Sequence, residues 1–271
     1  MIVDKSDVGQ LLDYLGLDSA AYSLYRVQKR VKYRLAGRSY TVEIGRARAK
    51  FLIPTMNEWT DFRTLDEQPV LEHLLSNVRP DDVFYDIGAN TGLYSCLVAD
   101  LVDEPIIAFE PHPDNADRLE ENAELNDANV SLHRVALAES AGEAELTLTI
   151  DKVGSAGHSL VPDERGDLGT VTITKTRGDD LITQEDLPQP TVIKIDVEGA
   201  EHDVLDGLES ALSHPACRLV YCETHADRLA SRGYSLEEVR RTLESHGFSV
   251  SEMTVRDGKG ETMLIGEKTD S

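Results

Sequence analysis

The sequence predicts an α/β fold built on a mostly parallel sheet. From Asp81 onward, short apolar runs alternate with segments of helical spacing, which is typical of parallel strands joined by crossover helices. Near the C-terminus, the alternating runs FSVSEMTV and ETMLIG flank an Asp-Gly turn, and this pattern predicts an antiparallel hairpin. We therefore expect a Rossmann-like, seven-stranded sheet that is closed by the hairpin.

Five apolar runs are expected to be buried strands, and two alternating runs to be half-exposed strands. The buried runs are Val83–Ile87, Pro105–Glu110, Val130–Leu137, Thr191–Val197 and Cys217–Glu223, and the alternating runs are Ala144–Ile150 and Thr170–Thr176. Three helices are predicted by apolar spacing and end signals: Glu67–Leu75, Pro113–Leu125 with proline in its first turn, and Ser235–His246 with Glu238 three residues after its serine cap.

The segment before residue 70 differs in character from the rest of the chain. It contains two short predicted strands, Ser39–Ile44 and Ala49–Ile53. We expect an N-terminal extension of a helix and short strands over residues 1–69, which could cap a second, larger domain over residues 70–271.

Composition indicates a protein without a membrane span. No run of eighteen apolar residues occurs among the 271 residues, and the first residues lack the pattern of a secretory signal. The three cysteines are odd in number and lack metal-ligand spacing, so we expect neither a disulfide framework nor a zinc ribbon. These observations favour a cytoplasmic location.

The charge balance is strongly acidic, with 50 Asp and Glu against 27 Lys and Arg and a formal net charge of -23. Such a chain repels phosphate backbones, so we expect no nucleic-acid partner. Solubility in concentrated salt is one physical reason for this charge, and we favour a halophilic source over an ordinary acidic cytosolic protein.

One segment, Arg26–Lys50, departs from this acidic character. It carries nine of the 27 cations and a single acid, Glu43. It could dock an anionic partner, a lipid head group or an acidic acceptor, or it could be a solvated face that pairs with the protein's own acids. We favour self-pairing. An RNA partner would be compatible with the sequence only through this segment.

A glycine-containing turn follows the first buried strand and predicts a nucleoside-binding site. The turn residues are Asp86, Ile87, Gly88, Ala89, Asn90, Thr91 and Gly92. The glycines allow the backbone to pass close beneath a ligand and to open a helix. Glu110 follows Asp86 by 24 residues at the end of the next strand, where a carboxylate can accept hydrogen bonds from both hydroxyls of a ribose.

The turn favours S-adenosylmethionine over a dinucleotide. Asn90 occupies the middle position of the G-x-G-x-x-G pattern, where dinucleotide sites use glycine to approach a pyrophosphate. Asp86 suits the ammonium group of an amino-acid tail better than it suits phosphates. The alternatives are an NAD-dependent oxidoreductase on a similar sheet and a non-catalytic module that binds a nucleoside.

Acidic residues and a histidine follow the fourth and fifth buried strands. Asp196 and Glu198 stand two residues apart at one strand end, and Glu223 and His225 do so at the other. Methyl transfer to a hydroxyl needs one nearby base, and we expect His225 to fill this role, with Asp196 next. A divalent-metal site made of the same groups is an alternative that we do not favour.

Each of these groups also has a structural interpretation. Asp196 or Glu198 could cap the helix that begins near Gly199, and His225 could be an exposed loop residue. Lys194 lies within an apolar strand and is expected to pair with an acid, and Cys96 is expected in the core. His158 lies in the glycine-rich stretch Gly154–Gly169, which we expect to form a loop over the acceptor.

Three blocks of the sequence resemble the FkbM family of S-adenosylmethionine-dependent methyltransferases. The blocks are YDIGANTGLYS, AFEPHPDNADRLEENAELN and VIKIDVEGAEHDVLDGL, and the similarity runs from Val70 to Gly266. This resemblance implies a class I methyltransferase fold and O-methylation of a hydroxyl on a sugar, glycolipid or small metabolite. It also implies that the methionine part binds at the turn, the ribose at Glu110 beside Pro111, and the adenine along Ala136.

Overall fold

The computed structural model describes residues 18–65, 67–148, 169–256 and 261–268. The chain comprises two compact units. Unit 1 contains Met1–Tyr40 and Leu52–Thr64, and unit 2 contains Thr41–Phe51 and Leu65–Ser271.

Unit 1 is built around the helices α2 (Asp18–Ala36) and α3 (Met56–Thr64). Tyr33 of α2 packs on Trp59 of α3 with ring centroids 6.0 Å apart, and its hydroxyl donates a hydrogen bond of 2.6 Å to the carbonyl of Pro54. The guanidinium of Arg63 lies 4.6 Å from the centre of the Trp59 ring. Aromatic contacts therefore hold the two helices together.

A two-stranded sheet is formed by β1 (Ser39–Ile44) and β2 (Ala47–Leu52), and its residues 41–51 belong to unit 2. Within unit 2 this sheet is tied to the α/β core through backbone amides. The amide of Arg48 donates to Asp100, and the amide of Lys50 donates to Asn126.

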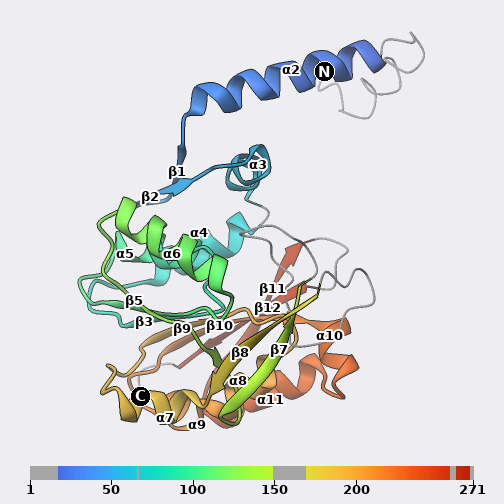
Figure 1. Cartoon of the computed structure of the whole chain (residues 1–271). Helices are drawn as coiled ribbons and strands as arrows, with labels where there is room; N and C mark the ends of the chain where they lie inside the picture. Colours follow the sequence, from blue (N-terminus) through green and yellow to red (C-terminus); the bar gives the residue numbers. More distant parts are fainter. Residues whose placement is uncertain (1–17, 66, 149–168, 257–260, 269–271) are drawn as a thin grey trace, which may run out of the picture. The chain divides into compact units, whose positions relative to one another are not determined.

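The seven-stranded sheet of unit 2 confirms the predicted fold (Figure 1). Its order is β11-β12-β10-β9-β3-β4-β5, and all pairs among β10, β9, β3, β4 and β5 are parallel. The hairpin is antiparallel, because β12 runs opposite to both β10 and β11. The strands are β3 (Phe84–Ile87), β4 (Ile106–Phe109), β5 (Val130–His133), β9 (Val192–Ile195), β10 (Leu219–His225), β11 (Ser249–Arg256) and β12 (Glu261–Glu267). The predicted Asp-Gly turn lies outside the described residues.

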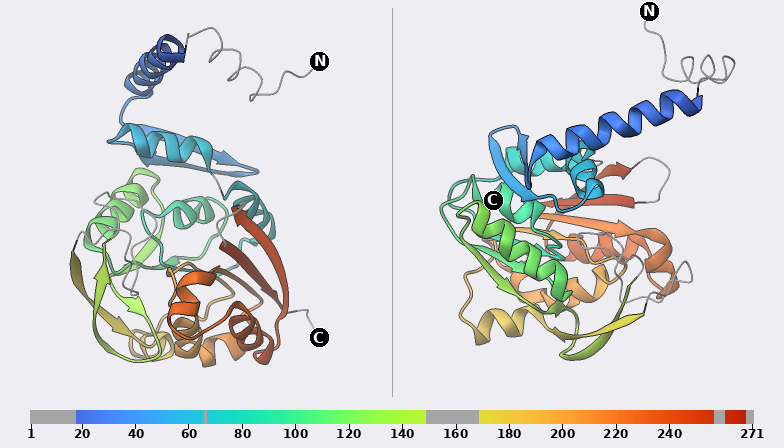
Figure 2. Two further views of the ribbon diagram at one scale, coloured as in Figure 1. Left: turned by 90° about the vertical axis from the view of Figure 1, so that its right-hand side faces the viewer. Right: turned by 45° about the horizontal axis from the view of Figure 1, so that its top comes forward.

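Helices cover both faces of this sheet, as the two further views also show (Figure 2). One face carries α4 (Gln68–Asn77), α5 (Leu93–Ala99) and α6 (Pro113–Leu125), and the other carries α7 (Gly178–Gln184), α8 (Glu201–Gly207), α9 (Glu209–Ser213) and α11 (Leu236–Ser245). A short helix, α10 (Ala226–Ser231), follows β10. The predicted capping of α11 is confirmed, since Ser235 and Glu238 each accept a hydrogen bond from the other's backbone amide.

The expectation of one strand over Val130–Leu137 is wrong. The chain leaves the large sheet after β5, where Arg134 pairs with Asp117 and Glu120 of α6 at 2.7 Å each. The next strand, β6 (Ala136–Leu137), belongs to a separate sheet of order β6-β8-β7. Its other members are β7 (Gly142–Thr147) and β8 (Thr170–Thr176), which pair antiparallel.

The core lies between the large sheet and its helices. Tyr85 and Phe109 are buried on neighbouring strands with their ring centroids 5.5 Å apart. The three cysteines are buried and form no disulfide, as expected, and Cys96 is core filler.

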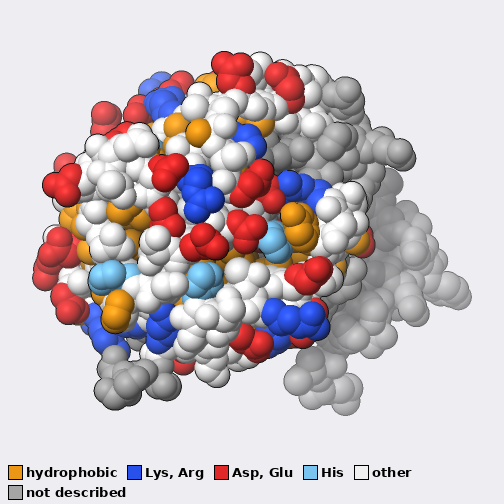
Figure 3. All heavy atoms as spheres, turned by 90° about the horizontal axis from the view of Figure 1, so that it is seen from below, with side chains coloured by type: hydrophobic (Ala, Val, Ile, Leu, Met, Phe, Trp, Pro, Cys, Tyr) orange, Lys and Arg blue, Asp and Glu red, His pale blue; other side chains and the backbone are white. Residues whose placement is uncertain are grey.

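On the face that Figure 3 shows, acidic side chains are spread out rather than gathered in one patch. Carboxylates lie there among lysines and arginines. Of the helices in the described ranges, none combines the length and apolar content that a membrane crossing requires.

Asp82 links three segments at the start of the sheet. Its carboxylate accepts hydrogen bonds from the amide of Arg79 at 2.7 Å and from the hydroxyl of Thr191 at 2.7 Å. It also pairs with the guanidinium of Arg218 at the base of β10. Asp82 is 2% exposed, so these partners compensate the cost of burying its charge.

Asp82→Ala is therefore expected to lower the free energy of unfolding by about 3–5 kcal/mol, because it leaves the Arg218 charge without its partner. Chemical denaturation of the two proteins in the same salt would measure the loss. The neighbouring exposed residue offers a control, and Asp81→Ala should change stability by less than about 0.5 kcal/mol. Equal stabilities of the Asp82 variant and the parent protein would contradict this account.

Candidate functional site

The turn between β3 and α5 approaches the acidic strand end closely. Gly88 has a φ of +76°, and a Cβ atom at this position would lie 1.9 Å from the carbonyl oxygen of Asp196. Asn90 also has a positive φ, of 52°, and Gly92 is the N-cap of α5. The glycine at position 88 is therefore required by both the backbone conformation and the close packing.

Glu110 lies at the end of β4 and is buried against the same turn. Its carboxylate accepts hydrogen bonds of 2.8 Å from the amides of Asn90 and His112, one on each oxygen. Burial raises the pKa of Glu110 to about 7, although these two hydrogen bonds oppose the shift. The carboxylate is thus oriented by the backbone and keeps lone pairs for further donors.

An open cavity lies over the carboxyl ends of the strands. Seven predicted site residues line it: Gly88, Asn90, Glu110, Pro111, Ala136, Asp196 and Glu198. Its apolar wall includes Leu146 of β7 and Ile173 of β8, which the sequence analysis did not identify. The alternation in AELTLTI could have indicated that Leu146 points inward, but not what it faces.

Four other predicted cofactor residues do not line this cavity. Asp86 is fully buried and accepts a hydrogen bond of 2.6 Å from the Ser95 hydroxyl of α5. Ala89 packs in the core, the carbonyl of Thr91 accepts a hydrogen bond from Asn122, and Gly92 begins α5. In the structure these residues shape the turn from beneath.

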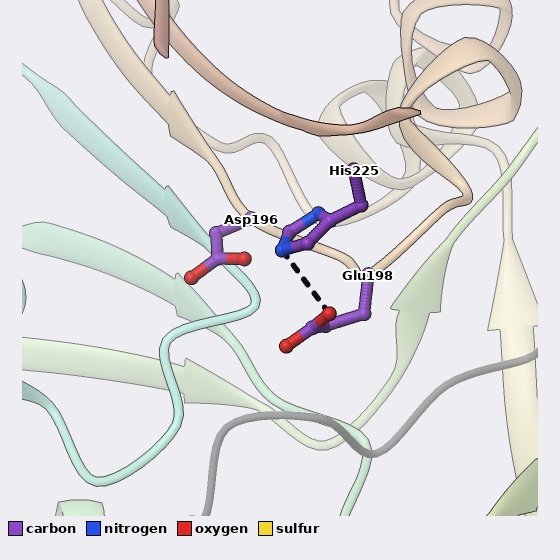
Figure 4. A group of neighbouring side chains, drawn as sticks. All are labelled: Asp196, Glu198 and His225. Atoms are coloured by element: carbon purple, nitrogen blue, oxygen red, sulfur yellow. Dashed lines mark ion pairs between the residues drawn. The ribbon is translucent and has the colours of Figure 1, made fainter. Parts of the chain in front are cut away.

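The predicted catalytic residues come together, because β9 and β10 are parallel neighbours (Figure 4). Asp196 and Glu198 follow β9, and Glu198 has a φ of 56°, in the left-handed region that non-glycine residues rarely adopt. Glu223 and His225 end β10. The α8 helix begins at an N-cap, Ala200, that has no side-chain hydrogen bond.

His225 is buried between carboxylates, so the interpretation as an exposed loop residue is wrong. Its Nδ1 lies 3.0 Å from Oε1 of Glu201, and its Nε2 lies 3.1 Å from Oε2 of Glu198. Glu201 is fully buried and also accepts a hydrogen bond from the amide of Gly199. Burial alone would lower the pKa of His225, but these carboxylates outweigh it and raise the pKa to about 9.

The buried acids are balanced by two further cations. Lys194 lies 3.2 Å from Asp196 and 3.9 Å from Asp86, which confirms its expected pairing with an acid. Arg228 of α10 lies 2.6 Å from Glu198. Burial and the charge of Asp196 raise the pKa of Glu223 to about 9.

The same cluster could hold a metal ion. Asp196, Glu198 and His225 each offer one ligand atom, and these atoms lie within 4.8 Å of one another. The contact between His225 and Glu201 is of the kind that orients metal-binding histidines. However, Lys194 and Arg228 already place positive charge beside both carboxylates, and this opposes a divalent cation.

Comparison with known proteins identifies the family. The model of the methyltransferase FkbM domain matches residues 86–250. The chain belongs to the FkbM methyltransferase family. The match spans both the turn after β3 and the acidic ends of β9 and β10. This FkbM family member is therefore a methyltransferase, as the sequence predicts, and neither an oxidoreductase nor a non-catalytic binding module.

Two relatives and one solved structure agree with this assignment. The hexuronic acid methyltransferase AglP of Haloferax volcanii is 34% identical over 83% of this chain and 87% of the relative. The 31-O-demethyl-FK506 methyltransferase FkbM of Streptomyces tacrolimicus is 28% identical over 64% of this chain and 75% of the relative. A crystal structure of a methyltransferase FkbM from Methylobacillus flagellatus shares the fold, with a TM-score of 0.51 and 18% identity over 72% of this chain and 46% of that chain.

The first of these relatives comes from a halophilic archaeon. Its source agrees with our interpretation of the acidic composition, in which a net charge of -23 keeps the chain hydrated in concentrated salt.

Proposed function

We propose that this methyltransferase transfers a methyl group from S-adenosylmethionine to a hydroxyl group of a hexuronic acid. The main support is that a single cavity is lined both by Glu110 and by the acidic pair Asp196 and Glu198. A nucleoside and an acceptor hydroxyl could therefore meet in one space. The acceptor class is supported by the printed activity of the Haloferax relative.

The described cavity suits the nucleoside part of S-adenosylmethionine. Glu110 would accept hydrogen bonds from the ribose hydroxyls, and Ala136 would lie along the adenine beside the apolar wall of the small sheet. Gly88 and Asn90 would hold the methionine part, with Asp86 below them. When bound, the cofactor supplies a methyl group on a positively charged sulfur.

We propose that Asp196 receives the proton of the acceptor hydroxyl. Both ring nitrogens of His225 face carboxylates at 3.0 and 3.1 Å, so this geometry gives the imidazole a positioning role for Glu198. Asp196 lines the cavity, and its side chain is 25% exposed. This assignment differs from our first expectation, in which His225 is the base and Asp196 comes next.

Metal-assisted catalysis is the alternative use of this cluster. A divalent cation on Asp196, Glu198 and His225 would orient two acceptor oxygens and lower the pKa of the reacting hydroxyl. We favour the metal-free arrangement, because Arg228 and Lys194 already contact the two carboxylates.

We also propose a role for the N-terminal segment in acceptor selection and a cellular location for the protein. We propose that residues 1–69 act as a cap on the acceptor side, since this segment lies outside the matched domain of residues 86–250. The glycine-rich stretch and His158 lie outside the described residues, apart from Gly169. We also propose a cytoplasmic location, which the three free thiols support.

Incubation with S-adenosylmethionine and simple uronic acid glycosides should yield products that carry one added methyl group. The methyl should survive mild alkali, because an ether is stable where a methyl ester is hydrolysed. Mass spectrometry before and after alkali would measure this outcome. The matched neutral glycosides, with a hydroxymethyl group in place of the carboxylate, are the control. An alkali-labile methyl, or transfer to none of the sugars, would contradict the proposal.

Glu110→Gln should weaken binding of S-adenosylhomocysteine by about 2–3 kcal/mol, because it replaces a charge-assisted acceptor of ribose hydrogen bonds. In the parent protein, affinity should also fall as the pH drops through about 7, where the raised pKa of Glu110 lets the carboxylate gain a proton. Calorimetric titration at several pH values would measure both effects. The control is Glu124→Gln on the exposed face of α6. Unchanged pH dependence in the Glu110 variant would refute this role.

Asp196→Asn should lower turnover by roughly 10²- to 10⁴-fold and leave the affinity for S-adenosylhomocysteine nearly unchanged. His225→Gln should cost less, because it removes only a positioning contact. Initial rates with the uronic acid glycosides, with and without a chelator, would compare these variants. Loss of activity with the chelator, restored by added Mg²⁺ or Mn²⁺, would favour the metal alternative instead.

A further inference from the structure

The helix α2 exposes a stripe of aliphatic side chains. Val27, Val31 and Leu35 are 55%, 50% and 81% exposed, and they recur every fourth residue, which places them along one face of the helix. In the described part of the chain, the other exposed large hydrophobic residue is Leu125, at 36%. The exposed apolar surface is thus concentrated on α2.

This stripe faces away from the contact that anchors the helix within unit 1. Tyr33 packs on Trp59, and its hydroxyl donates hydrogen bonds to the carbonyls of Ile53 and Pro54. At 3.6 residues per turn, Tyr33 points about 160° away from both Val31 and Leu35. The anchoring face is therefore aromatic, and the aliphatic face is turned outward.

Cations flank the stripe. Lys29, Arg30, Lys32 and Arg34 lie on the same ten residues of α2, and no acid occurs between Asp18 and Glu43. Among the described residues of unit 1, no acid forms an ion pair with any of these four side chains. The expected self-pairing is confirmed for Arg48, which lies 3.1 Å from Glu43.

A second copy of this chain is a poor partner for such a face. Two copies joined stripe to stripe would bring two sets of cations together without an acid between them. Elsewhere on the described surface, Leu125 is the large apolar residue that a second copy could offer in exchange. The combination of an apolar stripe and unpaired cations instead matches a surface that is anionic outside and apolar beneath.

We propose that α2 docks this protein onto an anionic lipid surface. The aliphatic stripe would enter the boundary between head groups and acyl chains, while the flanking lysines and arginines keep their charges among the lipid phosphates. At low ionic strength, the net charge of -23 repels the rest of the chain from such a surface, so attachment is confined to this helix. Binding of this kind is peripheral and reversible.

Vesicle flotation with the full chain tests the proposal. The protein should float with phosphatidylglycerol vesicles and much less with phosphatidylcholine vesicles. Val27→Gln, Val31→Gln and Leu35→Gln, combined in one chain, should lower the bound fraction about tenfold or more, because glutamine keeps the helix and the charge but removes the apolar stripe. Leu125→Gln is the matched control and should float like the parent protein.

The charged residues are tested separately. Replacing Lys29, Arg30, Lys32 and Arg34 with glutamine should remove the preference for phosphatidylglycerol while leaving weak binding through the stripe. At 1 M salt the screening length falls to about 3 Å. The parent protein should therefore lose its preference for phosphatidylglycerol in concentrated salt but stay bound to vesicles. Unchanged titration of S-adenosylhomocysteine and unchanged helical circular dichroism would show that each variant remains folded.

Three results would overturn the proposal. The first is a folded parent protein that stays monomeric and binds neither kind of vesicle. The second is a dimer that the triple glutamine variant dissociates, without vesicle binding by either protein. The third is vesicle binding that the triple variant and the Leu125 control lose equally.

Discussion

The ammonium group of Lys194 holds together the two carboxylates on which both parts of the site depend. It lies on β9 between Asp86, under the turn after β3, and Asp196, at the edge of the cavity. The ring of Tyr94 covers it at 4.8 Å, and the side chain is only 4% exposed. Burial disfavours its charge, yet the surrounding acids outweigh this effect and raise its pKa. Without this cation, the carboxylates of β3 and β9 would repel one another inside the protein.

A second set of contacts balances the charges of the side chains near the end of β10. Glu198 receives positive charge from Arg228 and contacts His225, which in turn contacts the fully buried Glu201. The site therefore consists of alternating acids and bases that fix one another's positions. Such networks stabilise a folded protein only when nearly every member has a partner, and this requirement limits which of these residues can vary alone.

The sequence was sufficient to predict the sheet because its signals are local. The apolar runs that became β3, β4 and β9 are short, and each is followed within four residues by a glycine or proline, at Gly88, Pro111 and Gly199. The split after His133 could not be predicted, because Arg134 leaves the sheet to reach Asp117 and Glu120 of another element. For the same reason, Leu146 and Ile173 were not identified as lining residues, since their role depends on how two sheets meet.

The site was predicted in part. Spacing placed Asp196, Glu198 and His225 at strand ends, and the neighbouring strands bring them together. The contacts of His225 with Glu201 and of Glu198 with Arg228 depend on side-chain directions that spacing does not specify. Spacing gives no sign that Glu201, the first residue of α8, is the buried partner of the histidine.

The small sheet forms one wall of the cavity and is separate from the large sheet. Its strands β6, β7 and β8 all fall between β5 and β9 in the sequence, and none of them pairs with a strand of the large sheet. Substitutions or length changes in this segment can alter the wall at Leu146 and Ile173 while the pairing of β3 with β4 and β9 stays as it is. Relatives can therefore diverge in this one segment while the strand ends that serve methyl transfer stay unchanged.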